Sequence, residues 1–396
     1  MRTWLTPERR NLIALAGAWA VLMWVVFATR PLMPIDELRY ASVAWEMWLR
    51  GDLLVPHLNG QPYSHKPPLL FWLIDAGWLV FGVSELWTRL VAPLFGVITV
   101  LAMPSMFRLV WPERPERAAI APWILFGALL WTVVGTVTMF DMLNALFALG
   151  AVAGLVLVWR GRHAAGWAAF GLCVGLGILA KGPVILVYAL PPLLLAPWWL
   201  RGQGVHWWRW ASGAAGALAL GAVVALAWAI PAGFAGGDEY RAAILWGQTA
   251  GRGSESFAHA RAIWWYLPLL PLALFPWLLW PRVWRGLRRL WRTDDPGLRL
   301  CIAWAGGGLV MLSLVSGKQP HYLIPLLPAV ALIVAATLPE PARRPGRDLL
   351  IPGAATVLVG AGIAGLVAWI QAGPGLAALD LPEFAVNISV LCGAAI

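Results

Sequence analysis

The chain is poor in the residue types on which soluble, disulfide-bonded and metal-binding proteins depend. Only 12% of its 396 residues are charged, about half of the roughly 25% found in soluble domains. It has three cysteines, each in an apolar stretch typical of small core residues, which argues against a disulfide framework or a cysteine-based metal site. Lysine is equally scarce, since only three of the 29 basic residues are lysines.

Long apolar stretches are present where charge is missing. Hydrophobic residues make up 60% of the chain, which includes 28 tryptophans, and stretches of about 20 apolar residues, each long enough to cross a bilayer, recur along it. The sequence therefore predicts an all-α polytopic membrane protein. We expect about 12 transmembrane helices, over residues 11–29, 88–107, 118–138, 141–159, 164–180, 183–200, 210–230, 263–281, 298–316, 320–338, 349–371 and 385–396.

The chain is expected to form a single transmembrane domain, residues 1–396, with two longer loops on one side of the membrane. The first loop, residues 30–87, contains "PIDELRYASVAWEMWLRG", which predicts an amphipathic helix ended by Gly51. It also contains "PPLLFWLIDAGWLVFG", which is short for a span and is expected to lie along the interface. The second loop covers residues 232–262. No soluble C-terminal domain is seen, and because the last span is cut short we expect the chain to be a fragment.

The basic residues are divided unevenly between the two sides of the membrane. With the N-terminus placed in the cytoplasm, the cytoplasmic segments hold 19 of the 29 basic and 7 of the 19 acidic residues. Their formal charge is +12, against −2 on the outer side, in agreement with the positive-inside rule. Orientation in the membrane thus explains the net charge of +10, and nucleic acid is not an expected partner.

All three lysines fall on the outer side, each just before a proline. They are Lys66 in "HKPP", Lys181 in "AKGP" and Lys318 in "GKQP". Proline is favoured in the first turn of a helix, and a lysine beside a helix N-terminus makes a site for an anion, above all phosphate. Each lysine alone could simply extend to the membrane interface, but three in one setting favour anion binding.

Further polar residues collect on the same outer side. They are Asp36, Glu37, Tyr63 and His65 in the first loop, Asp141 at the start of a span, Arg252 and His259 in the second loop, and His321 and Tyr322 after Lys318. Singly, the acids could be helix caps and the others ordinary surface residues. Together they predict a site for a phosphate-bearing lipid, in which cations hold the phosphate as leaving group and a carboxylate positions or deprotonates an acceptor hydroxyl.

The first loop resembles a known family. "PIDELRYASVAWEMWLRGDLLVPHLNGQPYSHKPPLLFWLIDAGWLVFG" is similar to the front of the bacterial protein-mannosyltransferase-like superfamily, which includes the lipid A aminoarabinose transferases. The later stretches "GLGILAKGPVILV", "RGSESFAHARAIWWYLPLL" and "GKQPHYLIPLLPAVAL" also match. The resemblance covers residues 11 to about 338. It implies a GT-C glycosyltransferase fold, an undecaprenyl-phosphate-linked sugar as donor, and an active site facing the periplasm from the bacterial inner membrane.

The resemblance also implies roles for individual residues. Asp36 matches the catalytic acid, with Glu37 beside it, and Asp141 matches a second acid. Lys66 matches the lysine on the donor phosphate, with Tyr63 as its neighbour, while Arg252 and Tyr322 match later phosphate-contacting positions. His65 stands where the family often has an acid, so a divalent metal ion is left open and no cofactor is firmly expected.

Several alternatives remain open at this stage. The acceptor could be lipid A or lipopolysaccharide, or a protein, and the sequence does not disclose the sugar. A transporter or lipid flippase is the rival reading, although transporters place charges near the bilayer midplane and often show repeated halves, which this sequence does not. A lipid-binding scaffold would use the lysines but would have no need of Asp36 and Asp141.

Overall fold

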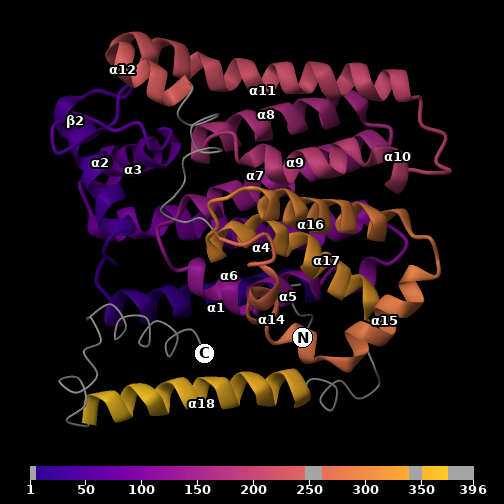
Figure 1. Cartoon of the computed structure of the whole chain (residues 1–396). Coiled ribbons are helices and arrows are strands. Elements are labelled where there is room, and N and C mark those ends of the chain that lie inside the picture. The colour runs from indigo at the N-terminus through magenta and orange to yellow at the C-terminus, as the bar shows by residue number, and fades with distance from the viewer. Residues whose placement is uncertain (1–5, 246–260, 339–349, 373–396) are drawn as a thin grey trace.

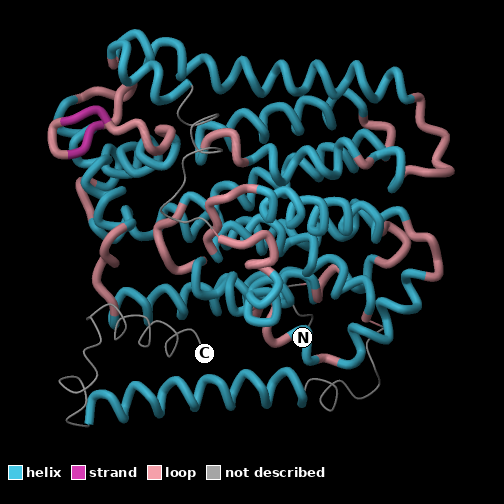
Figure 2. The backbone as a smooth tube through the Cα atoms, viewed as in Figure 1, coloured by secondary structure: helices cyan, strands magenta, loops and turns pink. Residues whose placement is uncertain are grey.

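The computed structural model describes residues 6–245, 261–338 and 350–372. Within these ranges the chain is almost entirely helical (Figure 2). The strands are confined to one short antiparallel hairpin, β1 (His57–Leu58) and β2 (Gln61–Pro62). The long helices lie side by side in one bundle (Figure 1).

Seven helical stretches of the described chain are long and apolar enough to cross a membrane, so the predicted all-α membrane class is confirmed. Predicted spans 118–138, 183–200 and 263–281 are not among them, and span 385–396 lies outside the described residues. The predicted count of twelve stays a prediction. The seven are α1 (Pro7–Thr29), α4 (Glu85–Val110), α7 (Phe140–Trp159), α8 (His163–Lys181), α11 (Trp207–Ala235), α16 (Pro296–Leu314), and η6 (Pro320–Leu326) continued by α17 (Leu327–Thr337).

Three predicted spans are broken into short pieces, so the expectation of continuous helices was wrong there. Prolines recur in 183–200 and 263–281, and a proline inside a helix removes a backbone donor and clashes with the preceding turn. Residues 118–138 hold one proline, Pro122, near the start of the first piece, and the break there falls at Gly127. The pieces are α5 (Ala121–Phe126) and α6 (Leu129–Val134); α9 (Ile185–Leu194) and α10 (Ala196–Trp199); and η4 (Leu267–Leu269), α14 (Leu270–Ala273) and η5 (Trp277–Leu279).

The breaks complete one another's hydrogen bonds. The amide of Leu129, at the break between α5 and α6, donates to the carbonyl of Phe275 over 3.0 Å. The indole of Trp277 donates to the carbonyl of Ile124 over 2.7 Å. Because lipid offers no partners for backbone groups, such mutual contacts let non-helical backbone exist inside the bundle.

The helices α7 and α8 pack closely against each other. A Cβ placed on Gly154 of α7 would lie 2.6 Å from the carbonyl oxygen of Gly166 on α8, so only glycine fits at this crossing. Small residues at helix interfaces allow such close packing in membranes. The pair brings the first turn of α7 beside the last turn of α8, and this juxtaposition places two site residues.

The two ends of the bundle differ in character. At one end, called the loop end, lie the hairpin, α2 (Asp36–Arg50) and α3 (Leu69–Phe81), and α12 (Gly237–Ala242) lies there too (Figure 1). Gly51 ends α2 with a positive φ of 64°, as predicted. The opposite end, called the arginine-rich end, carries η1 (Pro115–Arg117) and α15 (Pro281–Trp291). Further along, α18 (Leu350–Ala372) forms over predicted span 349–371.

Candidate active site

Glu37 is a structural clamp at the loop end. Its side chain is fully buried, and its carboxylate accepts hydrogen bonds from the Arg30 guanidinium and from the amides of Met33 (2.8 Å) and Thr138 (2.7 Å). Arg30 also donates to the carbonyl of Thr136 over 2.8 Å. Glu37 therefore ties the end of α1, the start of α2 and the segment before α7 together. Its carboxylate is buried and already accepts three hydrogen bonds, so the structure gives Glu37 an anchoring role, and the catalytic role implied by the resemblance stays a prediction.

Asp36, the adjacent acid, remains accessible. Its side chain is 42% exposed, and its carboxylate accepts from the Arg39 guanidinium and from the Tyr40 hydroxyl over 3.2 Å. Burial, and then the nearby Asp36 charge, raise the pKa of Tyr40 well above its ordinary value, so this phenol stays a donor. Asp36 is thus an oriented carboxylate with room for a further partner.

Asp141 and Lys181 form a buried ion pair where α7 begins and α8 ends. Lys181 Nζ lies 2.5 Å from Asp141 Oδ1, and their side chains are 6% and 1% exposed. An acid in a first turn and a base in a last turn both match the helix dipole. Lys181 was predicted to lie at a helix N-terminus, but it ends α8 instead, so the dipole argument for anion binding does not apply to it.

The site residues of separate segments meet around the ring of Phe140. Lys66 Nζ lies 5.6 Å from its centroid, and the Tyr40 ring packs edge-on at 4.8 Å. Phe140 immediately precedes Asp141 in the first turn of α7. Lys66, Asp36 through Tyr40, and the Asp141–Lys181 pair therefore gather near this one ring.

The segment after α16 completes this surface. His321 Nε2 lies 3.9 Å from Asp141 Oδ2, and Lys181 Nζ lies 4.5 Å from the centroid of the Tyr322 ring. The Tyr188 hydroxyl donates to the carbonyl of Tyr322 over 3.0 Å. His321 and Tyr322 thus belong to the same cluster as the two buried charges.

Two predicted residues of the first loop stack beside Lys66. The rings of Tyr63 and His65 lie 5.3 Å apart and nearly parallel. Tyr63 is buried against Phe71 of α3, whereas His65 is exposed. Tyr63 therefore anchors the loop that carries Lys66 to α3, and His65 lies on the exposed surface of that loop.

Lys318 has a different environment from the other two lysines. It is 3% exposed, and its ammonium donates to the carbonyls of Val315 (2.5 Å) and Arg261 (3.1 Å). Burial lowers its pKa. These contacts fasten the turn between α16 and η6 to the preceding segment, so the geometry does not support the predicted contact of Lys318 with a donor phosphate.

Two predicted residues, Arg252 and His259, lie outside the described residues. Within residues 6–245, 261–338 and 350–372, no group of three or more histidines, cysteines or acids is arranged to hold a metal ion. The metal site that the sequence left open thus gains no support from this part of the chain.

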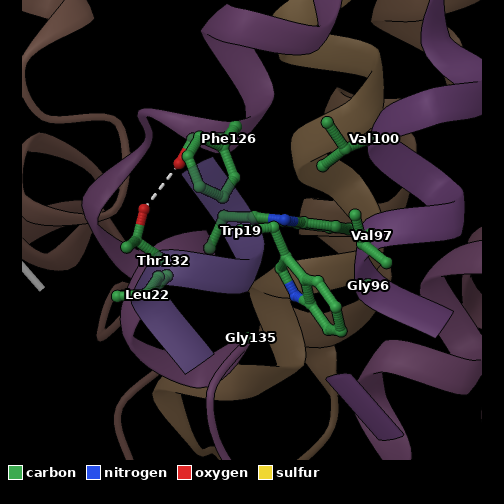
Figure 3. Close-up of a pocket in the computed structure, with 9 residues that line it drawn as sticks. Trp19, Leu22, Gly96, Val97, Val100, Phe126, Thr132 and Gly135 are labelled. Atoms are coloured by element: carbon green, nitrogen blue, oxygen red, sulfur yellow. Dashed lines mark hydrogen bonds between the residues drawn. The ribbon is translucent and has the colours of Figure 1, made fainter. Parts of the chain in front are cut away.

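A small apolar hollow lies away from this cluster (Figure 3). Trp19, Phe126, Val97 and Val100 line it, and the Thr132 hydroxyl donates to the carbonyl of Phe126 over 2.6 Å. Its volume is only about 10 Å³, at the lower limit for a single water molecule. This hollow is a packing gap and not part of the site.

Sequence reasoning missed Arg30, Tyr40 and Phe140. Arg30 carries a signal that could have been used, because it ends the first span on the side that the positive-inside rule leaves poor in arginine. Tyr40 carries one too, because it stands four residues after Asp36 on the predicted helix, where side chains are neighbours. Phe140 carries no such signal, since its position beside Lys66 and Tyr40 depends on how the first loop packs against α7.

These features define a multi-pass membrane protein with its acids and lysines gathered at one end of a helical bundle. The fold is that of ArnT from Cupriavidus metallidurans, a GT-C glycosyltransferase fold. The TM-score is 0.70 at 23% identity, covering 96% of this chain and 74% of that one. The structure of that protein bound to undecaprenyl phosphate gives 0.69 at 22% identity, with the same coverage.

A family model described as dolichyl-phosphate-mannose-protein mannosyltransferase matches residues 65–232. The chain belongs to this family of membrane proteins. It is 30% identical over 374 residues to the undecaprenyl phosphate-alpha-4-amino-4-deoxy-L-arabinose arabinosyl transferase of Pseudomonas aeruginosa, which covers 91% of this chain and 65% of that protein. The chain spans less than two thirds of the length of the curated relatives that it matches.

The buried ion pair makes a prediction about stability. Lys181→Met should lower the free energy of unfolding by about 3–5 kcal/mol, because it leaves Asp141 as an unpaired buried charge. The double variant Asp141→Asn/Lys181→Met should recover most of that loss. The measurement is thermal unfolding in detergent, with Arg241→Met as control, since its partner Asp238 is 90% exposed. Equal effects of Lys181→Met and Arg241→Met would contradict the prediction.

Proposed function

We propose that the protein is an integral-membrane glycosyltransferase that moves a sugar from an undecaprenyl-phosphate donor to a lipid or protein acceptor. The observation that carries this proposal is the placement of Lys66, Asp36 and the Asp141–Lys181 pair around Phe140. A cation against this ring and an accessible carboxylate beside the neighbouring Tyr40 suit a phosphate leaving group and an acceptor. The names of the curated relatives and the undecaprenyl phosphate bound to the Cupriavidus protein support it.

In this proposal the donor phosphate lies against Lys66. The bond between the sugar C1 and the phosphate oxygen breaks, and its electron pair stays on the phosphate, where Lys66 stabilises the growing charge. The acceptor oxygen then forms the new bond to C1. An acceptor hydroxyl gives its proton to Asp36, whereas an acceptor phosphate of lipid A is already ionised and is only oriented by Asp36.

The buried pair gives this surface its shape. Asp141 and Lys181 neutralise each other at the point where α7 meets α8, and His321 and Tyr322 pack beside them. The ring of Tyr322 lies against the Lys181 ammonium in this cluster, and the contact of Tyr322 with the donor phosphate that the resemblance implies stays a prediction. Lipid A or lipopolysaccharide is the acceptor that the relatives' names favour, and lipid A mass spectrometry with and without the gene would test it.

The rival assignment, a transporter or lipid flippase, has less support. Transporters bind substrate near the bilayer midplane, between repeated halves. Here the charged cluster lies where α7 begins and α8 ends, at the loop end of the bundle. We further propose that the loop end faces the periplasm of the bacterial inner membrane and that the chain crosses the membrane twelve times, with the broken helices included.

With a hydroxyl acceptor, Asp36→Asn should lower the transfer rate by about 10²–10⁴-fold, the usual contribution of a general base, with the protein still folded. With an ionised phosphate acceptor the rate should fall less, because only the orientation is lost. The assay is transfer of radiolabelled sugar by purified protein in liposomes that contain the donor lipid and either acceptor. Asp238→Asn is the matched control, because it removes an exposed carboxylate from α12 at the same end. Activity of Asp36→Asn within threefold of the wild type would reduce Asp36 to a helix-terminal acid.

Lys66→Ala should lower transfer roughly ten- to hundredfold, because a charge-assisted contact of this kind contributes about 1.5–3 kcal/mol. Lys66→Arg should restore only part of the rate, since the guanidinium is larger and its donors point differently. Arg50→Ala, which removes an exposed cation from the same loop, should have little effect. Rates are compared across donor-lipid concentrations at equal folded concentration. Normal kinetics of Lys66→Ala would place the phosphate elsewhere.

The proposed orientation can be tested by labelling single cysteines in a variant that lacks the three native ones. Gln61→Cys in the hairpin should react with a membrane-impermeant thiol reagent in intact spheroplasts. Arg288→Cys on α15 should react only after the membrane is opened, because the arginine-rich end should lie in the cytoplasm. Both positions are exposed in the structure. If only Arg288→Cys were labelled in intact spheroplasts, the protein would have the opposite orientation in the membrane.

A further inference from the structure

A large basic cavity lies at the arginine-rich end, away from the proposed active site. Its volume is about 670 Å³, within the range of roughly 300–1,000 Å³ typical of ligand sites. Five guanidinium groups line it, those of Arg114, Arg117, Arg282, Arg285 and Arg289. None of the described residues that line it is acidic.

The arginines come from two segments far apart in the sequence. Arg114 and Arg117 lie at and beside η1, and the other three lie on α15. The positive-inside rule requires only that arginines lie on the cytoplasmic side. It does not require two segments to direct five guanidinium groups around one hollow, so orientation in the membrane alone leaves this arrangement unexplained.

One wall of the cavity is fixed by protein contacts. Arg117 donates to the carbonyl of Ala336 over 2.7 Å, and Arg114 pairs with Asp295 at 3.1 Å. On the other wall, the side chains of Arg285 and Arg289 form no hydrogen bond or ion pair with any described residue, and both residues are exposed. Two guanidinium groups of the second wall are therefore available to an anion.

The position of α15 is set by a close backbone contact. A Cβ added at Gly286 would lie 1.9 Å from the carbonyl oxygen of Thr337 at the end of α17. Only glycine allows α15 to cross α17 at this depth. The arginines at positions 285 and 289 are thereby held at one side of this crossing, around the cavity that Thr337 and Leu338 also line.

The helix α15 also has the features of a membrane-surface helix. Trp284 and Trp291 are 48% and 63% exposed, and tryptophan is enriched where lipid meets water. The helix holds four arginines, and Arg292 directly follows it. They are interspersed with the two tryptophans and with buried Val283 and Leu290. A basic amphipathic helix of this kind lies in the plane of the interface and attracts anionic lipids.

We infer that this cavity binds the phosphate headgroup of an anionic phospholipid at the arginine-rich face of the membrane. Guanidinium groups bind phosphate oxygens through paired, charge-assisted hydrogen bonds. The phosphate could come from a lipid or from a soluble anion. The exposed tryptophans of α15 favour the lipid, because they place the cavity mouth at the headgroup level. The site is separate from the proposed active site and does not depend on the proposed transfer reaction.

The test measures binding to delipidated protein by thermal unfolding and by native mass spectrometry. Three probes are used. The first is detergent micelles that contain phosphatidylcholine as the only lipid, the second is the same micelles with diphosphatidylglycerol added, and the third is sodium pyrophosphate in solution. The diphosphatidylglycerol micelles should raise the unfolding temperature and leave bound lipid on the protein. Pyrophosphate should raise the unfolding temperature only at a far higher concentration. An equal response to pyrophosphate would overturn the assignment to a lipid.

A matched pair of double variants locates the site on α15. Arg285→Gln/Arg289→Gln removes two lining residues and should weaken lipid binding roughly ten- to hundredfold, as expected for lost charge-assisted contacts. Arg288→Gln/Arg292→Gln removes the same charge from exposed residues that do not line the cavity and should keep the binding. Equal loss in both would mean general attraction to the helix and would overturn the proposal.

The conservative variant Arg285→Lys/Arg289→Lys is a control for loss of lipid binding that is caused by misfolding. It keeps the charge and the fold but loses the paired geometry, so its lipid affinity should fall between those of the wild type and the glutamine variant. Size-exclusion chromatography checks that each variant is folded. Full affinity in the lysine variant and in the glutamine variant would show that Arg285 and Arg289 do not bind the headgroup.

Discussion

The buried ion pair between Arg30 and Glu37 is the constraint on which the loop end depends. It joins the end of α1 to the start of α2, and through Thr136 and Thr138 it reaches the segment that leads into α7. A buried charge without a partner is strongly destabilising, so these three segments stay together. Two adjacent carboxylates thus serve different purposes: Glu37 sets the frame, and Asp36, one residue earlier, is left open to the cluster around Phe140.

A second buried pair solves a related problem deeper in the bundle. The first turn of α7 and the last turn of α8 bring Asp141 and Lys181 together where neither meets water. The close contact of Gly154 with Gly166 joins the same two helices near their other ends. The two helices are therefore held together at both ends, by backbone packing at one and by the ion pair at the other.

Much of the architecture could be predicted from the sequence, because apolar length, proline position and charge asymmetry are local signals. The first-loop helices, the end of α2 at Gly51 and the gathering of Asp36, Lys66, Asp141, Lys181 and Tyr322 at one end follow from such signals. The partners of Glu37, Lys181 and Lys318 do not, since each is chosen by segments far away in the chain. The broken helices were missed because the hydropathy of a stretch is the same whether its helix is continuous or broken. The backbone groups freed at a break find hydrogen-bond partners in neighbouring segments that the sequence does not reveal.

The pairing of Lys181 has a consequence for how an anion would enter and leave this surface. A lone buried ammonium would hold a phosphate so tightly that its departure would be slow. Here a carboxylate already occupies that ammonium, so an arriving phosphate competes for a shared partner, and the carboxylate reclaims the lysine when the phosphate departs. We expect such an arrangement to favour exchange of a bound anion over its retention, which is what the proposed transfer from a phosphate-linked donor would require.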